Sequence, residues 1–456
     1  MTRSPTAAHD PTARALATPL VTGPAGAGGR PAAADYDRGV RGRAAPAEWM
    51  RLVRLAVVTA LIGVGGGVSG MVVSLGLHAV EHLAYGYSAG TFLSGVVGSA
   101  PWRRVLALAI AGVVGALGWW ALRRWAKPVV SVQDSVQGAR MPWLATVANA
   151  ALQVVVVGLG ASIGREVAPR ELGALFAGWL SEKVGLTAVE RRTLVACGAG
   201  AGLAAVYDVP VSGALFTLEV LLAQVTFATA VPALATAAIA TLVARLALPA
   251  GPLYTLPQVE VTPSLVAWAV VAGPLLGLAG HGFVVLAQLA ARHRPRGSAI
   301  LLVMPAVFLV VGLLAVPFPF LLGNGRALGE VAFAATTSVG LLAALAVLKT
   351  AATTATIGAG AAGGTLTPSL AIGAALGGAF GGLWVLVWPG TPVAAFAFVA
   401  AGAFLATSMR APFTALLLVV EFTDRGPALL LPAMIAIAGS VAVSQLMSRR
   451  WLTGVA

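Results

Sequence analysis

Apolar stretches of about 18 residues or more recur in this chain from Leu55 almost to its last residue, and they constrain its fold more than any other feature. A helix needs about that many residues to cross roughly 30 Å of hydrocarbon. Of the 456 residues, 58% are hydrophobic and only 10% are charged, whereas soluble domains carry about 25% charged residues. We therefore predict an all-α polytopic membrane protein with no room for a large soluble domain.

Several of the apolar segments are too short to cross a bilayer. They run over approximately 54–83, 104–122, 143–163, 192–206, 209–225, 228–248, 264–291, 299–320, 337–357, 369–390, 392–406, 411–422 and 428–446. The shortest hold 12 to 15 residues and indicate half-helices that end inside the bilayer, where protein or a water-filled cavity satisfies their free backbone groups. The 55 glycines and 27 prolines also favour broken and reentrant helices, which are typical of transport proteins.

Two segments of the chain align without a gap, GAGLAAVYDVPVSGALFTLEV (200–220) and GAFLATSMRAPFTALLLVVEF (402–422). Both hold a proline and a glutamate nine residues apart, and the glutamates are Glu219 and Glu421. This repeat predicts two inverted-topology halves, which in transporters bind the substrate at their interface near the middle of the membrane.

We predict three parts in the chain: a disordered cytoplasmic tail over 1–47, a first membrane repeat over 48–248 and a second over 249–456. The tail is rich in Ala, Pro, Gly and Arg, and it lacks the apolar surface that would offset the entropy of ordering. The net charge of +13 comes largely from cations beside apolar segments, such as Arg51 and Arg449. That placement favours contact with the lipid bilayer over nucleic-acid binding, and it puts both termini in the cytoplasm.

The most unusual segment is VVVVGLGASIGREVAPRELGALFAGWL, in which Arg165 and Glu166 interrupt a region otherwise suited to hydrocarbon. An ionisable residue there costs about 2.5 to 3.5 kcal/mol on insertion scales, so it normally faces a cavity. Glycines before it and Pro169 after it predict a helix N-terminus, where free N–H groups and the helix dipole bind anions. The Glu166 carboxylate can mimic such an anion and act as a gate. A structural Arg165–Glu166 pair is the alternative, although adjacent residues do not face each other on a helix.

The second half holds a matching pattern, TIGAGAAGGTLTPSLAIGAALGG, in which Thr365 and Leu366 precede a helix that starts near Pro368. We interpret it as a second backbone site for an anion, and the later glycines as close helix packing. A third polar break, SVQDSVQG, contains Ser131 and is by itself an ordinary polar loop. A serine hydroxyl can donate to an anion without adding charge.

These motifs together resemble those of the CLC chloride channel and transporter family, over roughly residues 50–455. GREVAP is similar to the family's GREGP, GGTLTP to GGIFAP, and VPVSGALFTLEV to N-A-P-L-A-G-I-L-F-I-x-E, while SVQDSVQG takes the place of GSGIPEIEG. The resemblance implies the CLC fold and a homodimer with one anion pathway in each subunit. It places the external gating glutamate at Glu166, and it implies that anions are held at Ser131, Gly164, Arg165, Val167, Thr365 and Leu366.

The chain departs from the family at two inner positions. Val220 stands where coupled exchangers of the family commonly carry a second glutamate for protons, and Thr453 stands at about the position of the family's inner tyrosine. We therefore expect passive or weakly proton-coupled chloride conduction, gated by Glu166. A chloride/proton antiporter that uses Glu166 and a water path is the alternative.

A non-transporting membrane scaffold or a membrane enzyme is the alternative from a different class. An enzyme would need a polar cluster at membrane depth. His78 and His82 have helical i, i+4 spacing with Glu81 between them, but we interpret them as a polar turn at the interface rather than a metal site. We expect no enzyme activity, no metal and no cofactor, with chloride or other small anions, and protons in the antiporter alternative, as the transported ions. The expected location is a bacterial inner membrane.

Overall fold

The computed structural model describes residues 33–425 and 427–453, which form α-helices joined by short loops. The helices are α1 (Ala33–Tyr85), α2 (Phe92–Gly98), α3 (Pro101–Trp125), α4 (Val132–Val136), α5 (Trp143–Gly158), α6 (Val167–Val184), α7 (Ala188–Tyr207), α8 (Pro210–Phe216), α9 (Phe227–Ala244), α10 (Pro263–Arg292), α11 (Ile300–Leu314), α12 (Arg326–Ala334), α13 (Val339–Gly358), α14 (Leu366–Trp384), α15 (Val393–Met409), α16 (Pro412–Thr423) and α17 (Leu430–Thr453). A π-helical turn, Thr217–Leu222, continues α8.

The chain divides into two units, Met1–Arg54 and Leu55–Ala456, and each is described by itself. In the first unit, α1 begins at Ala33, so residues 33–47 are helical where the sequence predicted disorder. Alanine and arginine are strong helix formers, which favours this local structure without a packed core. Residues 1–32 of the predicted tail lie outside the described residues.

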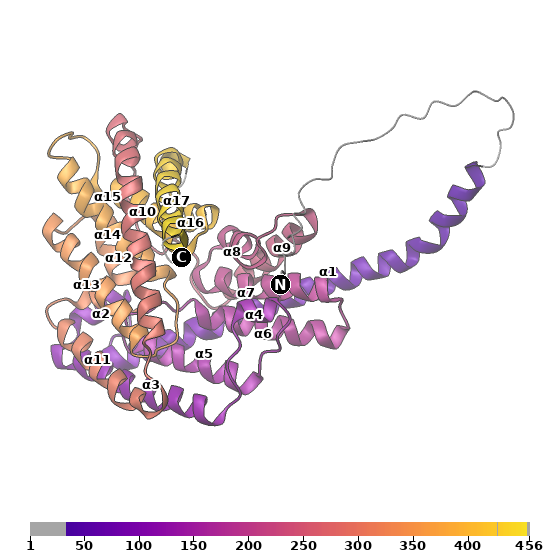
Figure 1. Ribbon diagram of the computed structural model, residues 1–456, viewed down its shortest axis with the longest axis horizontal. Helices are drawn as coiled ribbons and strands as arrows, with labels where there is room; N and C mark the ends of the chain where they lie inside the picture. Colours follow the sequence, from indigo (N-terminus) through magenta and orange to yellow (C-terminus); the bar gives the residue numbers. More distant parts are fainter. Residues whose placement is uncertain (1–32, 426, 454–456) are drawn as a thin grey trace, which may run out of the picture. The chain divides into compact units, whose positions relative to one another are not determined.

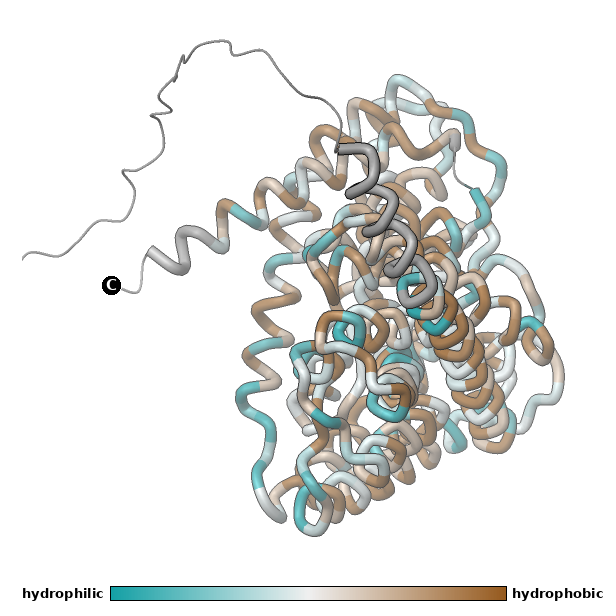
Figure 2. The backbone as a smooth tube through the Cα atoms, turned by 90° about the vertical axis from the view of Figure 1, so that its right-hand side faces the viewer, coloured by the Kyte–Doolittle hydropathy of each residue, from teal (hydrophilic) through white to brown (hydrophobic). Residues whose placement is uncertain are grey.

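The helices confirm the predicted class of all-α polytopic membrane protein. In the described residues, eight helices are long and apolar enough to cross a membrane, and four shorter apolar helices have 10–17 residues. Apolar residues fill long parts of the helices, whereas hydrophilic residues gather at turns and helix ends (Figure 2). The short segments 392–406 and 411–422 are short helices, as their lengths predicted, whereas 192–206 belongs to the 20-residue helix α7 because polar residues extend it at its start.

The centre of the second unit is built around α14 and α15. In the most apolar window of α14, 78% of the residues are buried inside the protein, against 28% in Gly297–Leu314. Helix α15 packs along α14, and α10 and α17 lie against α15 (Figure 1). Gly377 allows the close approach, because a methyl group there would lie 2.5 Å from the Phe396 carbonyl oxygen. Small residues therefore let α14 sit in the interior, where its N-terminus is shielded from lipid.

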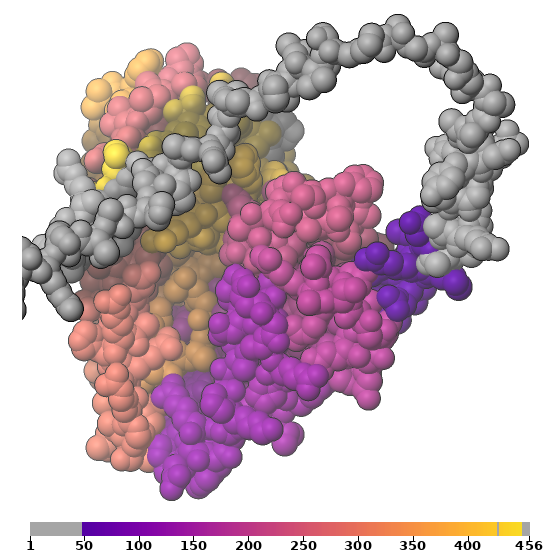
Figure 3. Space-filling model, turned by 45° about the vertical axis from the view of Figure 1, so that its right-hand side comes forward, coloured from indigo at the N-terminus to yellow at the C-terminus, as the bar shows by residue number. Residues whose placement is uncertain are grey.

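Two equivalent turns lead the chain into the centre of the protein. Helix α5 ends at Gly158 and α13 ends at Gly358, and two residues later Gly160 and Gly360 have φ angles of +104° and +101°. Glycine adopts this left-handed region without strain. The loops then run to the starts of α6 and α14. In the space-filling view, purple and magenta parts of the first half lie beside salmon-coloured and orange parts of the second (Figure 3).

A glutamate in each of the two repeated segments caps the start of a helix in the other segment. Glu219, at the end of the first segment, accepts hydrogen bonds from the N–H groups of Phe413 at 3.2 Å and Thr414 at 2.7 Å, at the start of α16. Glu421, at the end of the second, accepts from the N–H groups of Val211 at 2.9 Å and Ser212 at 2.7 Å, at the start of α8. Each carboxylate thus satisfies free N–H groups of the opposite helix start. The boundaries between the two repeats stay a prediction.

Candidate anion-binding site

The carboxylate of Glu166 lies where the two glycine-rich loops meet. Glu166 is the N-cap residue of α6, and none of its surface is exposed. Its Oε1 atom accepts a hydrogen bond of 2.7 Å from the backbone N–H of Leu366, the first residue of α14. Its Oε2 atom accepts bonds from the hydroxyls of Tyr207 at 3.3 Å and Thr367 at 3.4 Å. A side chain from the first half of the chain therefore binds the start of a helix in the second half.

The N-terminus of α14 binds negative charge because of its own electrostatics. The first four N–H groups of a helix have no partner within it, and the peptide dipoles place about half a positive charge there. Thr365 occupies the N-cap position, but its side chain makes no capping hydrogen bond. The Glu166 carboxylate takes that role by accepting from Leu366. An N–H group of this kind is also the type of donor that binds free anions at helix N-termini.

Tyr207 and Thr367 complete the contacts of the carboxylate, and neither was among the predicted site residues. Tyr207 is the last residue of α7. Its hydroxyl also lies 2.6 Å from that of Thr367, so two hydroxyls and the carboxylate form one buried network. In the aligned repeats Tyr207 lies opposite Met409. A hydroxyl-bearing residue at the end of the apolar stretch 194–206 was the available signal.

Gly164 and Gly364 allow the two loops to approach the Glu166 carboxylate. Their backbones form an antiparallel bridge with hydrogen bonds of 2.7 and 3.0 Å. A methyl group added to either glycine would overlap the carboxylate oxygens. Both positions therefore need glycine for space.

Arg165 and Val167 flank Glu166 in the chain, and neither side chain has a hydrogen bond to its carboxylate among the described residues. Val167 is the first residue of α6, and Arg170 one turn further donates a hydrogen bond of 2.8 Å to the backbone carbonyl of Glu166. The Arg165 guanidinium lies 5.0 Å from the centre of the Tyr207 ring. Within the described ranges, no ion pair joins Arg165 to Glu166. The structure thus gives no support to a structural pair of these neighbours.

Ser131 lies outside this network. It is the N-cap residue of α4, where its hydroxyl accepts from the Asp134 N–H at 3.1 Å and donates to the Asp134 carboxylate at 2.7 Å. Ser131 is exposed and lines a cavity of about 430 Å³ together with Arg123 and Lys127. Helix capping therefore occupies the hydroxyl in this structure, and its predicted contact with an anion stays a prediction.

The two inner positions lie on separate helices. Val220 is part of the π-helical turn Thr217–Leu222, next to the capping residue Glu219. Thr453 is the last residue of α17, and its side chain lies outside what the structure describes. Among the described residues, no group of three or more His, Cys, Asp or Glu side chains is arranged to hold a metal ion.

The fold and the site together define a polytopic helical membrane protein in which an acidic side chain occupies an anion-binding helix N-terminus. A family model described as "Voltage gated chloride channel" matches residues 111–445. The chain belongs to this family, the CLC family, as its motifs predicted. A putative chloride channel protein, ClcB-like, of Ralstonia nicotianae is 30% identical over 342 residues, which cover 71% of this chain and 78% of the relative.

Other relatives have the same fold or a similar sequence. The voltage-gated ClC-type chloride channel ClcB of Escherichia coli is 30% identical over 306 residues, 64% of this chain and 72% of the relative. The structure of a slow cyanobacterial Cl⁻/H⁺ antiporter has a TM-score of 0.76 at 22% identity, covering 86% of this chain and 95% of that chain. That of a CLC-type fluoride/proton antiporter has a TM-score of 0.69 at 22% identity, covering 87% and 97%. These structures show that the chain has the CLC fold.

Proposed function

We propose that this protein carries chloride across a membrane and that the Glu166 carboxylate is its gate. The observation that supports the proposal most is the buried hydrogen bond of 2.7 Å between Glu166 and the Leu366 N–H. This bond holds an acidic side chain at a helix N-terminus, which supports a site where a free anion binds in its place. Membership of the voltage-gated chloride channel family supports the choice of chloride.

The gate opens when the carboxylate leaves the N-terminus of α14. An anion then accepts the Leu366 N–H, and the hydroxyls of Tyr207 and Thr367, which now donate to Glu166, turn to the anion. Chloride exchanges water for these neutral donors, so no full cation is needed at the position. Protonation of Glu166 favours opening, because it removes the charge that the helix N-terminus stabilises.

Replacing Glu166 by alanine tests the gate. In proteoliposomes loaded with chloride, Glu166→Ala removes the competing carboxylate, so the resting efflux rate rises and loses its dependence on pH. Glu260, an exposed glutamate away from the site, supplies the control Glu260→Ala, which leaves both unchanged. Unaltered flux and pH dependence in Glu166→Ala would refute the proposed gate.

Passive or weakly coupled conduction is the form of transport that we favour. Val220 has no ionisable side chain at the position where coupled exchangers of the family commonly carry a proton-binding glutamate. Proton-coupled exchange is the second candidate. The buried hydroxyls of Tyr207 and Thr367 favour coupled exchange, because they form a hydrogen-bonded network with Glu166 that contains no second carboxylate. The zero-current voltage under crossed chloride and pH gradients separates the two. A voltage that ignores pH rejects coupling, and a voltage that shifts with pH rejects the passive channel.

We further propose that the protein works as a homodimer in a bacterial inner membrane, with both termini in the cytoplasm, no cofactor and no enzyme activity. Cations beside the terminal helices, such as Arg51 and Arg54, support this orientation by the positive-inside rule. Light scattering of the detergent-solubilised protein tests the dimer. Protease protection of tags at the two ends in sealed vesicles tests the orientation.

A further inference from the structure

Lys349 is a buried cation to which the proposed gate gives no role. It lies in α13, one of the helices that are long and apolar enough to cross a membrane, and none of its surface is exposed. Among the described residues, no carboxylate forms an ion pair with it. A charged side chain inside a membrane-spanning helix is costly, so it normally has specific partners and a function.

The ammonium group of Lys349 binds one short loop, residues 321–325, which we call the 321–325 loop. Its Nζ atom donates hydrogen bonds of 2.9 Å to the Leu321 carbonyl and 2.7 Å to the Gly323 carbonyl. A buried carbonyl that loses its donor is left with the cost of its own desolvation. Lys349 therefore fixes the 321–325 loop against α13.

The 321–325 loop contacts both sides of the candidate site. The Gly323 N–H donates a bond of 2.8 Å to the carbonyl of Gly160, in the glycine turn that leads to α6. Gly325 lies so close to the start of α14 that a methyl group there would be 3.1 Å from the Thr367 carbonyl oxygen. The loop thus lies between the turn before α6 and the start of α14.

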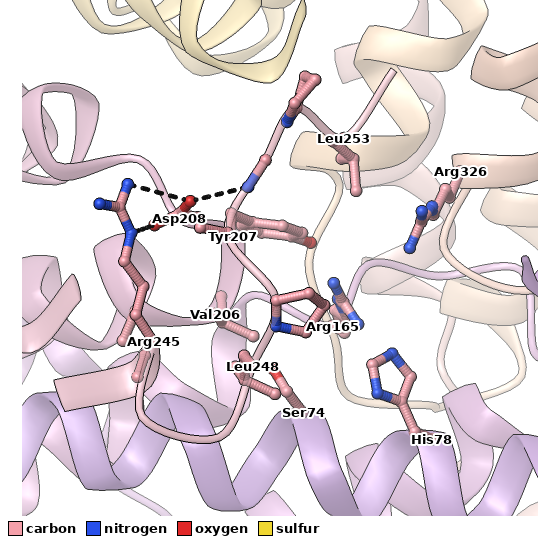
Figure 4. Close-up of a pocket in the computed structure, with 16 residues that line it drawn as sticks. Ser74, His78, Arg165, Val206, Tyr207, Asp208, Arg245, Leu248, Leu253 and Arg326 are labelled. Atoms are coloured by element: carbon pink, nitrogen blue, oxygen red, sulfur yellow. Dashed lines mark hydrogen bonds and ion pairs between the residues drawn. The ribbon is translucent and has the colours of Figure 1, made fainter. Parts of the chain in front are cut away.

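The same loop leads into the surroundings of Tyr207. It ends at α12, whose first residue is Arg326. Arg326 lines a cavity together with Arg165 and Tyr207, and the three side chains lie close together there (Figure 4). A shift of the loop would therefore also move a residue beside Tyr207, whose hydroxyl binds the Glu166 carboxylate.

Thr353, one helical turn after Lys349, holds the loop before Glu166 directly. Its hydroxyl lies 3.2 Å from that of Ser162, and neither residue is exposed. Ser162 precedes Glu166 by four residues in the same loop. Because residues i and i+4 lie on the same face of a helix, one face of α13 fixes this loop at two points.

We infer that Lys349 is a positioning residue for the Glu166 gate, with Thr353 as the second point of contact. Together they set the distance between the loop before Glu166 and the start of α14, at which the carboxylate reaches the Leu366 N–H at 2.7 Å. The inference rests on the proposed function and adds to it the element that holds the gate in place. Since hydrogen bonds from an ionised donor are stronger than neutral ones, Lys349 contributes more than Thr353.

Two substitutions test this role by chloride efflux from proteoliposomes. Lys349→Met keeps the length of the side chain but removes its donors, and it is expected to raise the resting efflux about three- to tenfold, because the carboxylate is held less firmly. Thr353→Val removes one neutral hydrogen bond and is expected to raise it about two- to fivefold. In a Glu166→Ala background neither should raise efflux further, because the carboxylate that they position is gone. A purely structural role would change efflux equally in both backgrounds.

Arg104 and Thr241 offer matched controls. Arg104 is also a buried cation on backbone carbonyls, with bonds of 2.9 Å to Val96 and 3.0 Å to Ser99. The Thr241 hydroxyl is buried and has no hydrogen-bond partner. Arg104→Met is expected to lower the thermal stability without changing the resting efflux, and Thr241→Val is expected to change neither.

Hydrogen–deuterium exchange of the Leu366 amide in detergent reports the position of the start of α14 without any flux. Exchange is expected to be faster in Lys349→Met and Thr353→Val than in the wild type, and unchanged in Arg104→Met. The inference is overturned if Lys349→Met and Thr353→Val leave efflux and exchange at the wild-type level, if they raise efflux equally with and without Glu166, or if Arg104→Met raises efflux as much. A wild-type protein without chloride flux would instead refute the proposed function, and the exchange of the Leu366 amide would still decide whether Lys349 positions the start of α14.

Discussion

The Tyr207 hydroxyl is the contact of the gate that can be removed with the least change of shape. It donates to the Glu166 carboxylate at 3.3 Å and lies 2.6 Å from the Thr367 hydroxyl. Tyr207→Phe removes one oxygen atom and keeps the ring, which packs against Phe422 at 5.3 Å between centroids. The variant therefore weakens the hold on the carboxylate without opening a cavity in the core.

The expected change in chloride efflux follows from the geometry of the Tyr207–Glu166 hydrogen bond. Hydrogen bonds to a charged group contribute about 1.5 to 3 kcal/mol. The distance of 3.3 Å is long for an O–H donor, and Thr367 stays within 3.4 Å of the same carboxylate oxygen. We therefore expect a loss of about 1 kcal/mol from the closed state, which makes departure of the carboxylate about fivefold more favourable. If departure of Glu166 limits the flux, the resting chloride efflux rises by a similar factor.

The assay is chloride efflux from proteoliposomes, with Tyr254→Phe as the control. The Tyr254 hydroxyl is also buried, yet it has no hydrogen-bond partner, and the ring packs against Phe333. Its removal should leave the flux unchanged. In a Glu166→Ala background, Tyr207→Phe should have no further effect, because the carboxylate that it holds is gone. Equal flux in Tyr207→Phe and wild type, or an equal effect in both backgrounds, would refute the assigned contact.

Two further variants test the space at the gate and the exchanged caps. Gly364→Ala places a methyl group on the Glu166 carboxylate, so the resting flux should rise toward that of Glu166→Ala, whereas Gly340→Ala, with open space around it, should not change the flux. Unchanged efflux in Gly364→Ala would contradict the close approach. Glu219→Gln weakens the bonds to the Thr414 N–H at 2.7 Å and hydroxyl at 2.6 Å, and should lower the unfolding free energy by about 1 to 2 kcal/mol. Thermal unfolding in detergent checks this, and an unchanged midpoint would argue against the cap.

The fold could be predicted largely from the sequence, because hydrocarbon imposes one rule on every segment. A backbone in a bilayer must satisfy its polar groups internally, so the apolar stretches had to be helices and the short ones had to end against protein. The segment predicted over 143–163 became α5, which ends at Gly158. The extra residues belong to the glycine loop that leads to Glu166. Hydropathy could not separate that loop from the helix, because its residues are equally apolar.

The candidate site could be predicted only in part. The Glu166 position and the start of α14 followed from charge, glycine and proline in GREVAP and GGTLTP, which are local signals. Tyr207 could not be found in the same way, because its contact with Glu166 depends on how α7 packs against α6 and brings its last residue to the start of α14. The occupied hydroxyl of Ser131 was also not predictable, since it depends on the rotamer that caps α4. Contacts between distant segments can be predicted only when the fold is known, whereas a helix start can be predicted from the residues next to it.

The acidic residues near the centre differ in the groups that hold them, and this difference bears on the proposed gate. Glu219 binds two backbone N–H groups at the start of α16, which would lose their cap if it left. Glu171 is held by side-chain amides, two bonds of 2.9 and 3.1 Å from Asn149 and one of 3.0 Å from Gln153. Glu166 is fully buried and is held by one N–H at a helix N-terminus and two hydroxyls, donors that a chloride ion can accept in its place. Its departure with an anion entering leaves no buried donor unpaired, so the exchange has a low energetic cost. Val220, beside Glu219, adds no further carboxylate there, and we therefore expect pH and chloride to act on the same residue, Glu166.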